Sequence, residues 1–442
     1  MDKWGPVERL DGVGRDDAEG ESVTTWLVAA IAAFVGIVIF LAAFRARSAV
    51  APTVTKPAAD AAVRGETEQA TRLIEQVLSS DERNPEALFV RACIRIQAGD
   101  LKAATEDTNQ LESLRGKLPE VRILRELVVA RGQTPPTGWM PAFVGALKKV
   151  GANGLDQHVL EYVPTSRRPL SSDVVGRLPG RDGFLLRAAE SGQPAPATLI
   201  SEAEQMVGQE QPIIILLAAV SVLSSPHVAD SDKPEATTAA HALIAKLARE
   251  NPREMYLQIW AALSDASDSS PLGETDVVKL EHVVSSTPIG LHLSGVYEAM
   301  RTAYTKVDPA QASEAAFAAT FAFYPPPFHV VLMRRTKPMI KSGDPTLRRR
   351  TGLAVARLAR EVMNQGSLLD LSIGSMLLGR AAALAGDSDL AADADRKRKE
   401  FQSLLRAADR LKFAAEWPIA GLMSELTERK AHGELELVRE LL

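Results

Sequence analysis

The sequence predicts an all-α protein in which one N-terminal transmembrane helix is followed by a solenoid of paired helices. Three observations predict this fold. The segment Ser22–Phe44 contains no charged residue. Behind it, glycines recur with a period of about 34 residues, within sequence of helical periodicity. No part of the chain shows the apolar–polar alternation between turn signals that is typical of β-hairpins.

Residues 1–21 form an acidic, glycine-containing tail that we expect to be disordered. The chain as a whole has 442 residues, a net charge of −5 and a pI of about 5.9. No global basic field therefore favours nucleic acid as a partner. The single cysteine, Cys93, excludes an intramolecular disulfide and argues against a cysteine-based zinc site.

The charge-free segment Ser22–Phe44 is long enough to cross a bilayer, since a helix needs about 20 apolar residues to do so. Trp26 lies near one end, where an indole ring favours the headgroup region. Arg45 and Arg47 end the segment abruptly at the other. These three residues are the expected anchor points of the helix in the membrane.

Two other interpretations of Ser22–Phe44 are weaker. A cleaved signal peptide has a shorter apolar run behind a basic region, whereas the preceding tail here is acidic. A buried helix of a soluble domain is the other alternative, and we rank it lower because this segment is apolar on all faces, as a membrane span is. The nearest basic residues follow the segment, which favours a cytoplasmic C-terminal body at a bacterial inner membrane and leaves the opposite topology open.

The rest of the chain divides by composition. We expect a linker over 45–60, helical repeats over 61–135, an irregular connection rich in proline, glycine and arginine over 136–198, a helical-repeat region over 199–330, and a C-terminal helical region over 331–442. The apolar run Pro212–Leu223 is too short to span a membrane, so it predicts a buried helix.

The internal repeat is clearest over residues 61–132. Gly65, Gly99 and Gly132 follow one another at intervals of about 34 residues. Pro85 and Pro119 are separated by the same interval, and each precedes a glutamate. Glycine ends a helix readily because the left-handed conformation costs it nothing, and proline suits the first turn of the next helix. The spacing therefore predicts consecutive helical hairpins.

On these residues the chain resembles the tetratricopeptide-repeat family. Weaker copies lie at Ala240–Pro252 and at Leu378–Ala391, where Gly386-Asp387 marks the expected turn of a hairpin in the C-terminal region. A non-repeat helical fold with a single tetratricopeptide cap is the alternative. The layout of an N-terminal anchor and a repeat body also resembles bacterial envelope-assembly proteins and, more loosely, mitochondrial import receptors.

The resemblance implies a concave groove that binds an extended peptide or helix of a protein partner. By family analogy, Phe89, Cys93 and Gln97 are directed into that groove, and Arg380 takes the corresponding position in the last repeat. Phe89 and Cys93 would make the groove apolar, so an apolar partner segment is expected rather than a clamped C-terminal carboxylate.

Catalytic motifs are missing from the sequence. It has no phosphate-binding glycine loop, no H-E-x-x-H motif, no G-x-S-x-G motif, and no pair of histidines at metal-binding spacing. We therefore expect neither enzymatic activity nor a cofactor, metal or small-molecule substrate. The alternative is an enzyme whose site lies within 138–235. A basic stretch over 334–350, with Asp344 as its one acid, predicts a solvated surface or contact with anionic headgroups.

Together these features predict a membrane-anchored scaffold or adaptor that binds other proteins. A self-associating structural component is a further alternative, with a C-terminal apolar surface made of Leu435, Leu437, Leu441 and Leu442.

Overall fold

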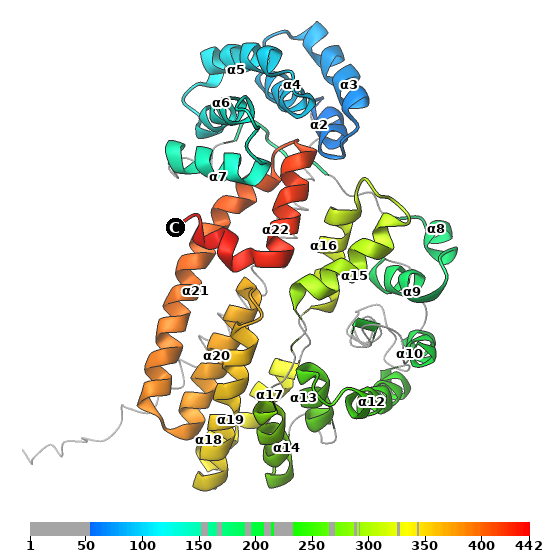
Figure 1. The fold of residues 1–442 in the computed structure, drawn as a ribbon, viewed down its shortest axis with the longest axis vertical. Helices are drawn as coiled ribbons and strands as arrows, with labels where there is room; N and C mark the ends of the chain where they lie inside the picture. Colours follow the sequence, from blue (N-terminus) through cyan, green and yellow to red (C-terminus); the bar gives the residue numbers. More distant parts are fainter. Residues whose placement is uncertain are drawn as a thin grey trace, which may run out of the picture. The chain divides into compact units, whose positions relative to one another are not determined.

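The computed structural model describes most of the chain behind the expected membrane segment (Figure 1). The described residues are 54–151, 158–165, 170–190, 196–206, 214–215, 233–264, 270–286, 290, 292–324, 328–342 and 344–442. They belong to one compact unit. They are helical with short connections, and this part of the chain contains no β-strand. The expected all-α class is thereby confirmed for these residues.

Three consecutive helical hairpins begin the described chain. They are α2 (Lys56–Val63) with α3 (Thr67–Ser80), α4 (Pro85–Ala98) with α5 (Leu101–Arg115), and α6 (Pro119–Arg131) with α7 (Trp139–Val150). The first helix of each hairpin also packs on the first helix of the next, so that α2, α4 and α6 adjoin one another. The hairpin array therefore extends to Val150, beyond the expected boundary at residue 135.

The turns of these hairpins follow local sequence signals. Gly65 and Gly99 have positive φ angles of 76° and 82°, and Gly99 caps α4 in the left-handed conformation. Asn84 and Asp100 cap the N-termini of α4 and α5 with their side chains. Gly132 differs from the other two glycines because its φ is −79°, and the connection to α7 is longer there.

The middle of the chain contains shorter helices: α8 (Ser172–Gly176), α9 (Gly180–Ala189), α10 (Pro196–Gln205), α12 (Lys233–Glu250), α13 (Met255–Ser264), α14 (Glu274–Ser285), α15 (Leu293–Thr305), α16 (Ala312–Phe323), α17 (Phe328–Thr336) and α18 (Met339–Ser342). α15 pairs with α16 and also packs on α9. Of the expected buried helix Pro212–Leu223, only residues 214–215 are described, and both are helical and buried.

Four long helices end the chain: α19 (Pro345–Met363), α20 (Leu368–Ala385), α21 (Ser388–Ala415) and α22 (Ala420–Arg439). The expected hairpin around Gly386-Asp387 is α20–α21, with Gly386 at a φ of 64° and Asp387 capping α21. α21 joins two hydrophobic cores, because Leu390 lies in the core of the middle helices and Leu411 lies in the core of α2–α7.

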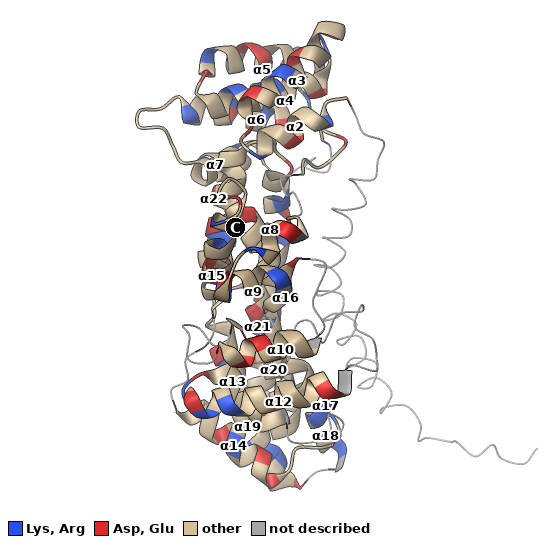
Figure 2. Cartoon of the chain, turned by 90° about the vertical axis from the view of Figure 1, so that its right-hand side faces the viewer, with Lys and Arg blue, Asp and Glu red and all other residues tan. Residues whose placement is uncertain are grey.

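The expected anchor at Ser22–Phe44, with Trp26, Arg45 and Arg47, lies outside the described residues. Within the described part, α20 is the one helix long and apolar enough to cross a membrane. Most of α20 is buried inside the protein, as a core helix would be. Charged residues of both signs are distributed over many of the described helices (Figure 2).

Candidate functional site

The residues expected to line an open groove are covered by the C-terminal part of the chain. Phe89 and Cys93, on α4, are both fully buried. Trp417, just after α21, packs edge-on against Phe89 at 5.0 Å and against Phe143 of α7 at 5.4 Å between ring centroids. The expectation of an exposed apolar groove at Phe89 and Cys93 is therefore wrong, because α21 and α22 fill that face of the hairpin array.

Cys93 is accordingly a structural residue. Burial raises the pKa of its thiol well above the usual value, and the nearby Glu120 raises it further. A thiol in this state is neither a good nucleophile nor a good metal ligand.

The other two expected groove residues also serve the protein's own packing. The Gln97 side-chain oxygen accepts a hydrogen bond of 3.4 Å from the backbone of Gly421, in the first turn of α22. Arg380 is 8% exposed, and burial lowers the pKa of its guanidinium. Among the described residues, its Nε atom has no hydrogen-bond partner. Arg380 is therefore inaccessible to a partner, whereas Gln97 is half-buried and contacts α22 of its own chain.

The expected self-association surface is likewise buried for the most part. Leu435, Leu437 and Leu441 belong to the core formed with the hairpin array, and only Leu442 of this set is exposed. α22 thus turns its apolar side toward its own chain.

The basic stretch 334–350 is divided between core and surface. Arg335 is buried, donates to Asp276 at 2.6 Å and also donates to the backbone oxygen of Ser270. Arg350 pairs with Glu274 and Glu281 of α14. Lys337, Lys341 and Arg349 are exposed. Arg348 also donates to the backbone oxygen of Ile340 at 3.1 Å, so three of the arginines hold loops and helices together.

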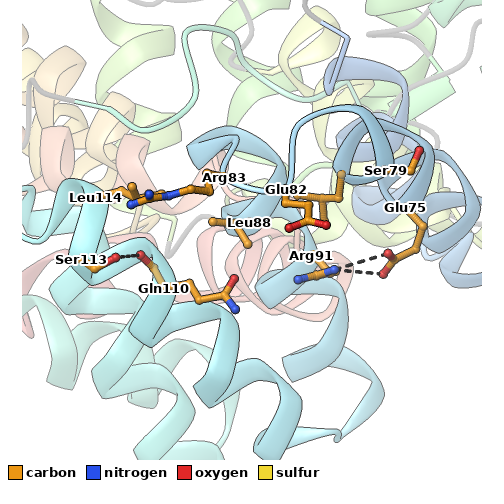
Figure 3. Close-up of a pocket in the computed structure, with 10 residues that line it drawn as sticks. Glu75, Ser79, Glu82, Arg83, Leu88, Arg91, Gln110, Ser113 and Leu114 are labelled. Carbon is orange, nitrogen blue, oxygen red and sulfur yellow. Dashed lines mark hydrogen bonds and ion pairs between the residues drawn. The ribbon is translucent and has the colours of Figure 1, made fainter.

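A surface groove lies on another face of the hairpin array, between α3, α4 and α5 (Figure 3). Its volume is about 640 Å³. Most of its lining is polar: Glu75, Ser79, Glu82, Arg83, Arg91, Gln110 and Ser113, with Leu78, Leu88 and Leu114. The groove therefore presents both charges and hydrogen-bonding groups, in contrast to the apolar groove that the sequence predicted.

Arg91 fixes one wall of this groove. It donates to the buried Asp107 at 2.7 Å and pairs with Glu75 at 3.3 Å. Arg95 also donates to Asp107 at 2.7 Å. Burial raises the pKa of Asp107, and the two arginines act against this shift. These ion pairs link α3, α4 and α5 along this wall of the groove.

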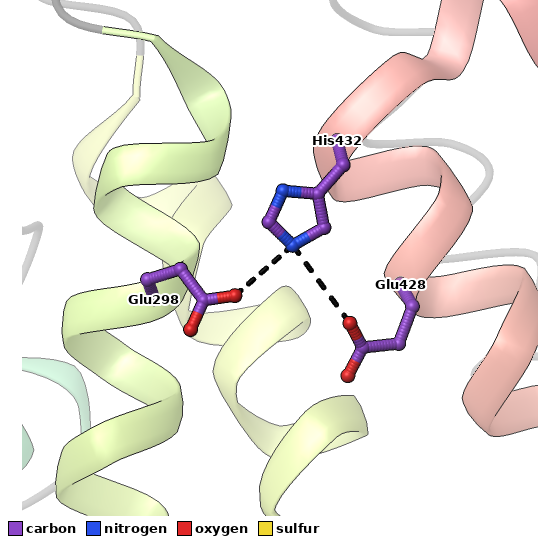
Figure 4. A group of neighbouring side chains, drawn as sticks. All are labelled: Glu298, Glu428 and His432. Atoms are coloured by element: carbon purple, nitrogen blue, oxygen red, sulfur yellow. Dashed lines mark hydrogen bonds and ion pairs between the residues drawn. The ribbon is translucent and has the colours of Figure 1, made fainter.

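A second cluster of polar residues joins α15 to α22 (Figure 4). The Nε2 atom of His432 lies 3.0 Å from Glu298 and 3.7 Å from Glu428. One ligand atom of each of the three side chains lies within 4.8 Å of the other two. The sequence did not reveal this cluster, because Glu298 is far from Glu428 and His432 along the chain.

A cavity of about 850 Å³ adjoins the same histidine. It lies between α19, α20, α21 and α22, and its lining combines His432 and Gly433 with charged residues of both signs, among them Arg360, Asp393, Lys397, Glu400, Glu436 and Arg439. Gly433 interrupts the helical geometry of α22 directly after His432.

The region named as an alternative enzyme site, 138–235, is described only in part. Two buried acids of this region contact the C-terminal end of α15. Asp182 of α9 pairs with Lys306, and Glu190, directly after α9, accepts from the Tyr304 hydroxyl at 2.5 Å. Both contacts serve packing.

Comparisons with known proteins add no identification. No family model, no curated protein and no solved structure matches this chain.

Proposed function

We propose that this protein is a membrane-anchored helical-repeat scaffold that binds a protein partner through the groove between α3, α4 and α5. The observation that carries the proposal is the array of three adjoining hairpins, α2–α7, with this groove on its surface. The regular spacing of Gly65, Gly99 and Gly132 supports a tetratricopeptide-like origin of the array. Repeat arrays use such extended surfaces to bind peptides.

The lining of the groove favours a polar partner segment. Glu82 and Arg83 lie on the α3–α4 connection, and Gln110 and Ser113 face them from α5 (Figure 3). A segment with charges of both signs would complement Glu82 and Arg83, and backbone amides would find partners in Gln110. Partner recognition here rests on hydrogen bonds and charge, which supply specificity at such surfaces.

Membrane attachment is assigned to Ser22–Phe44. The absence of charge throughout this segment supports the assignment, because its length suits a bilayer and its flanking Arg45 and Arg47 suit a cytoplasmic end. In this proposal the anchor holds the hairpin array near the membrane, where the groove recruits its partner.

The test is cross-linking in intact cells followed by mass spectrometry, with full-length protein and two charge reversals, Glu82→Lys and Arg83→Glu. We expect specific partners to cross-link to the wild-type protein and to be reduced at least tenfold in both variants. Lys102→Glu is the matched control, because Lys102 is exposed on α5 and does not line the groove. Equal recovery of the partners in all four proteins would place the binding surface elsewhere.

A further inference from the structure

We propose that Glu298, Glu428 and His432 form a binding site for a divalent transition-metal cation of the zinc class. The inference is independent of the scaffold function. Three donors on two helices converge on one point, and neighbouring side chains hold both carboxylates in place.

The convergence is geometric. His432 directs its Nε2 atom between Glu298 Oε1 and Glu428 Oε2, at 3.0 and 3.7 Å (Figure 4). Donor atoms that bind one zinc ion at about 2.1 Å lie roughly 3–4 Å apart from each other. The two measured separations fall in this range, so small side-chain adjustments are sufficient to bring the three donors around one ion.

The other oxygen of each carboxylate is already engaged. Glu298 Oε2 accepts from Arg301 at 3.0 Å, and Glu428 Oε1 accepts from Tyr297 at 3.1 Å and from Arg301 at 3.2 Å. Ser313 donates to the same Glu428 oxygen at 3.3 Å. Outer hydrogen bonds of this kind orient metal ligands and tune their affinity. They leave Glu298 Oε1 and Glu428 Oε2 directed toward His432.

The aromatic ring of Tyr297 adds to this arrangement. It packs edge-on against the His432 imidazole, with ring centroids 5.7 Å apart. The Tyr297 hydroxyl donates a hydrogen bond to Glu428 Oε1 at 3.1 Å. Tyr297 of α15 thus contacts both His432 and Glu428.

Charge and donor type indicate the class of ion. Two carboxylates face one guanidinium, that of Arg301, which leaves a negative charge within the cluster for a cation to neutralise. An imidazole nitrogen together with carboxylate oxygens suits zinc and related transition metals better than calcium or magnesium, which prefer oxygen ligands alone. The His432, Glu298 and Glu428 side chains are 45%, 38% and 33% exposed, so an ion and its remaining water ligands can reach the donors from solvent.

A bound ion would cross-link α15 to α22. It would join the middle helices to the C-terminal helix that covers the hairpin array, and would stabilise that arrangement by binding only the folded state.

The test is isothermal titration calorimetry of metal-free, full-length protein in detergent with zinc chloride, with manganese chloride and calcium chloride in parallel. We expect one zinc ion per chain, weaker manganese binding, no calcium binding, and a rise of the thermal midpoint with zinc. His432→Ala and Glu428→Gln are each expected to weaken zinc binding tenfold or more.

His282→Ala is the matched control, because His282 is also an exposed histidine on a helix that carries glutamates. This control must bind zinc like the wild type. Far-ultraviolet circular dichroism shows whether each variant keeps its helical content. The proposal is overturned if the wild type binds no zinc, or if folded His432→Ala binds zinc as tightly as the wild type does.

Discussion

At the scale of single residues, the buried glutamate Glu120 connects the hairpin array to the segment 158–165. Its Oε2 atom accepts a hydrogen bond from the backbone of Val159, and its Oε1 atom has no partner among the described residues. Burial raises the pKa of Glu120 from 4.5 to about 7, while the Val159 N–H and His158 act in the opposite direction. The folded state therefore favours the protonated acid.

The pH dependence of stability follows from this shift. Between about pH 4.5 and pH 7 the folded protein binds more protons at Glu120 than the unfolded chain does. The free energy of unfolding must therefore fall as the pH rises through this window, by about 3 kcal/mol from this residue alone. Glu254 and Asp370, whose pKa values burial raises to about 7 and about 6, act in the same direction.

We expect Glu120→Gln to reduce this pH dependence, because the amide stays neutral and keeps an acceptor for Val159. The variant should gain stability relative to the wild type at about pH 8 and differ little at about pH 5. Urea unfolding of the full-length protein at both pH values measures this difference. Glu68→Gln, at an exposed position of α3, is the control that should leave the free energy of unfolding unchanged at both pH values. If the free energy of unfolding changes with pH equally in the wild type and in Glu120→Gln, the raised pKa of Glu120 is not the cause of the pH dependence.

Gly99 gives a second prediction at the residue scale. Its φ of 82° is the left-handed conformation, and a Cβ atom placed there would meet no other atom within 4 Å. Gly99→Ala should therefore cost about 1 kcal/mol from backbone conformation alone. Gly132→Ala, at a φ of −79°, should cost less. Chemical denaturation measures the loss of unfolding free energy in each variant. Equal losses would show that the left-handed conformation at Gly99 does not cause the destabilisation.

At the scale of elements, the packing of the C-terminal helices on the hairpin array is concentrated at Trp417. This side chain is fully buried and touches the rings of Phe89, Phe143 and Phe413. Its place directly after α21 lets one residue contact both α4 and α7. The apolar residues Phe89 and Cys93, which the sequence predicted to line an open groove, are thereby used for folding.

Trp417→Ala should destabilise the protein by about 3–5 kcal/mol, because it removes a large buried side chain and leaves a cavity. Amide hydrogen exchange should accelerate most in α22 and α4, the elements nearest the lost contact. Leu442→Ala is the control, since Leu442 is 70% exposed and its loss should have little effect. If the exchange rates in Trp417→Ala are the same as those in the wild type, the Trp417 contacts contribute little to the stability of these helices.

At the scale of the whole molecule, we propose separate parts of the chain for membrane attachment and for partner binding. The anchor prediction rests on residues 22–44, and the groove lies between residues 75 and 114. The two activities should therefore be separable by mutation.

Replacing Val35 and Ile37 with arginine should release the protein from membranes, because a charged side chain near the bilayer centre costs about 2.5–3.5 kcal/mol on insertion scales. Sodium carbonate extraction followed by immunoblotting measures the distribution. Glu82→Lys should stay in the membrane fraction like the wild type. Extraction of the wild-type protein by carbonate would disprove an integral anchor.

Local sequence signals were sufficient to predict the helical class and several turns. Gly65, Gly99 and Gly386 end helices with positive φ angles, and Asn84, Asp100 and Asp387 cap helices with their side chains. Such signals can be read from the chain because the interactions that produce them span only a few residues. The regular glycine spacing also predicted the positions of the turns within the consecutive hairpins.

Only the tertiary structure decided which surfaces remain accessible. The apolar character of Phe89 and Cys93 fits an open groove and a buried core equally well. Trp417, from near the other end of the chain, packs on Phe89, so that these residues lie in a core. The Glu298–Glu428–His432 cluster and the polar groove at α3–α5 depend in the same way on how helices pack. Burial and side-chain convergence arise from long-range contacts, whereas helix formation and capping arise from neighbours in the sequence. For this reason the sequence determined the elements of this protein, and the packing determined its sites.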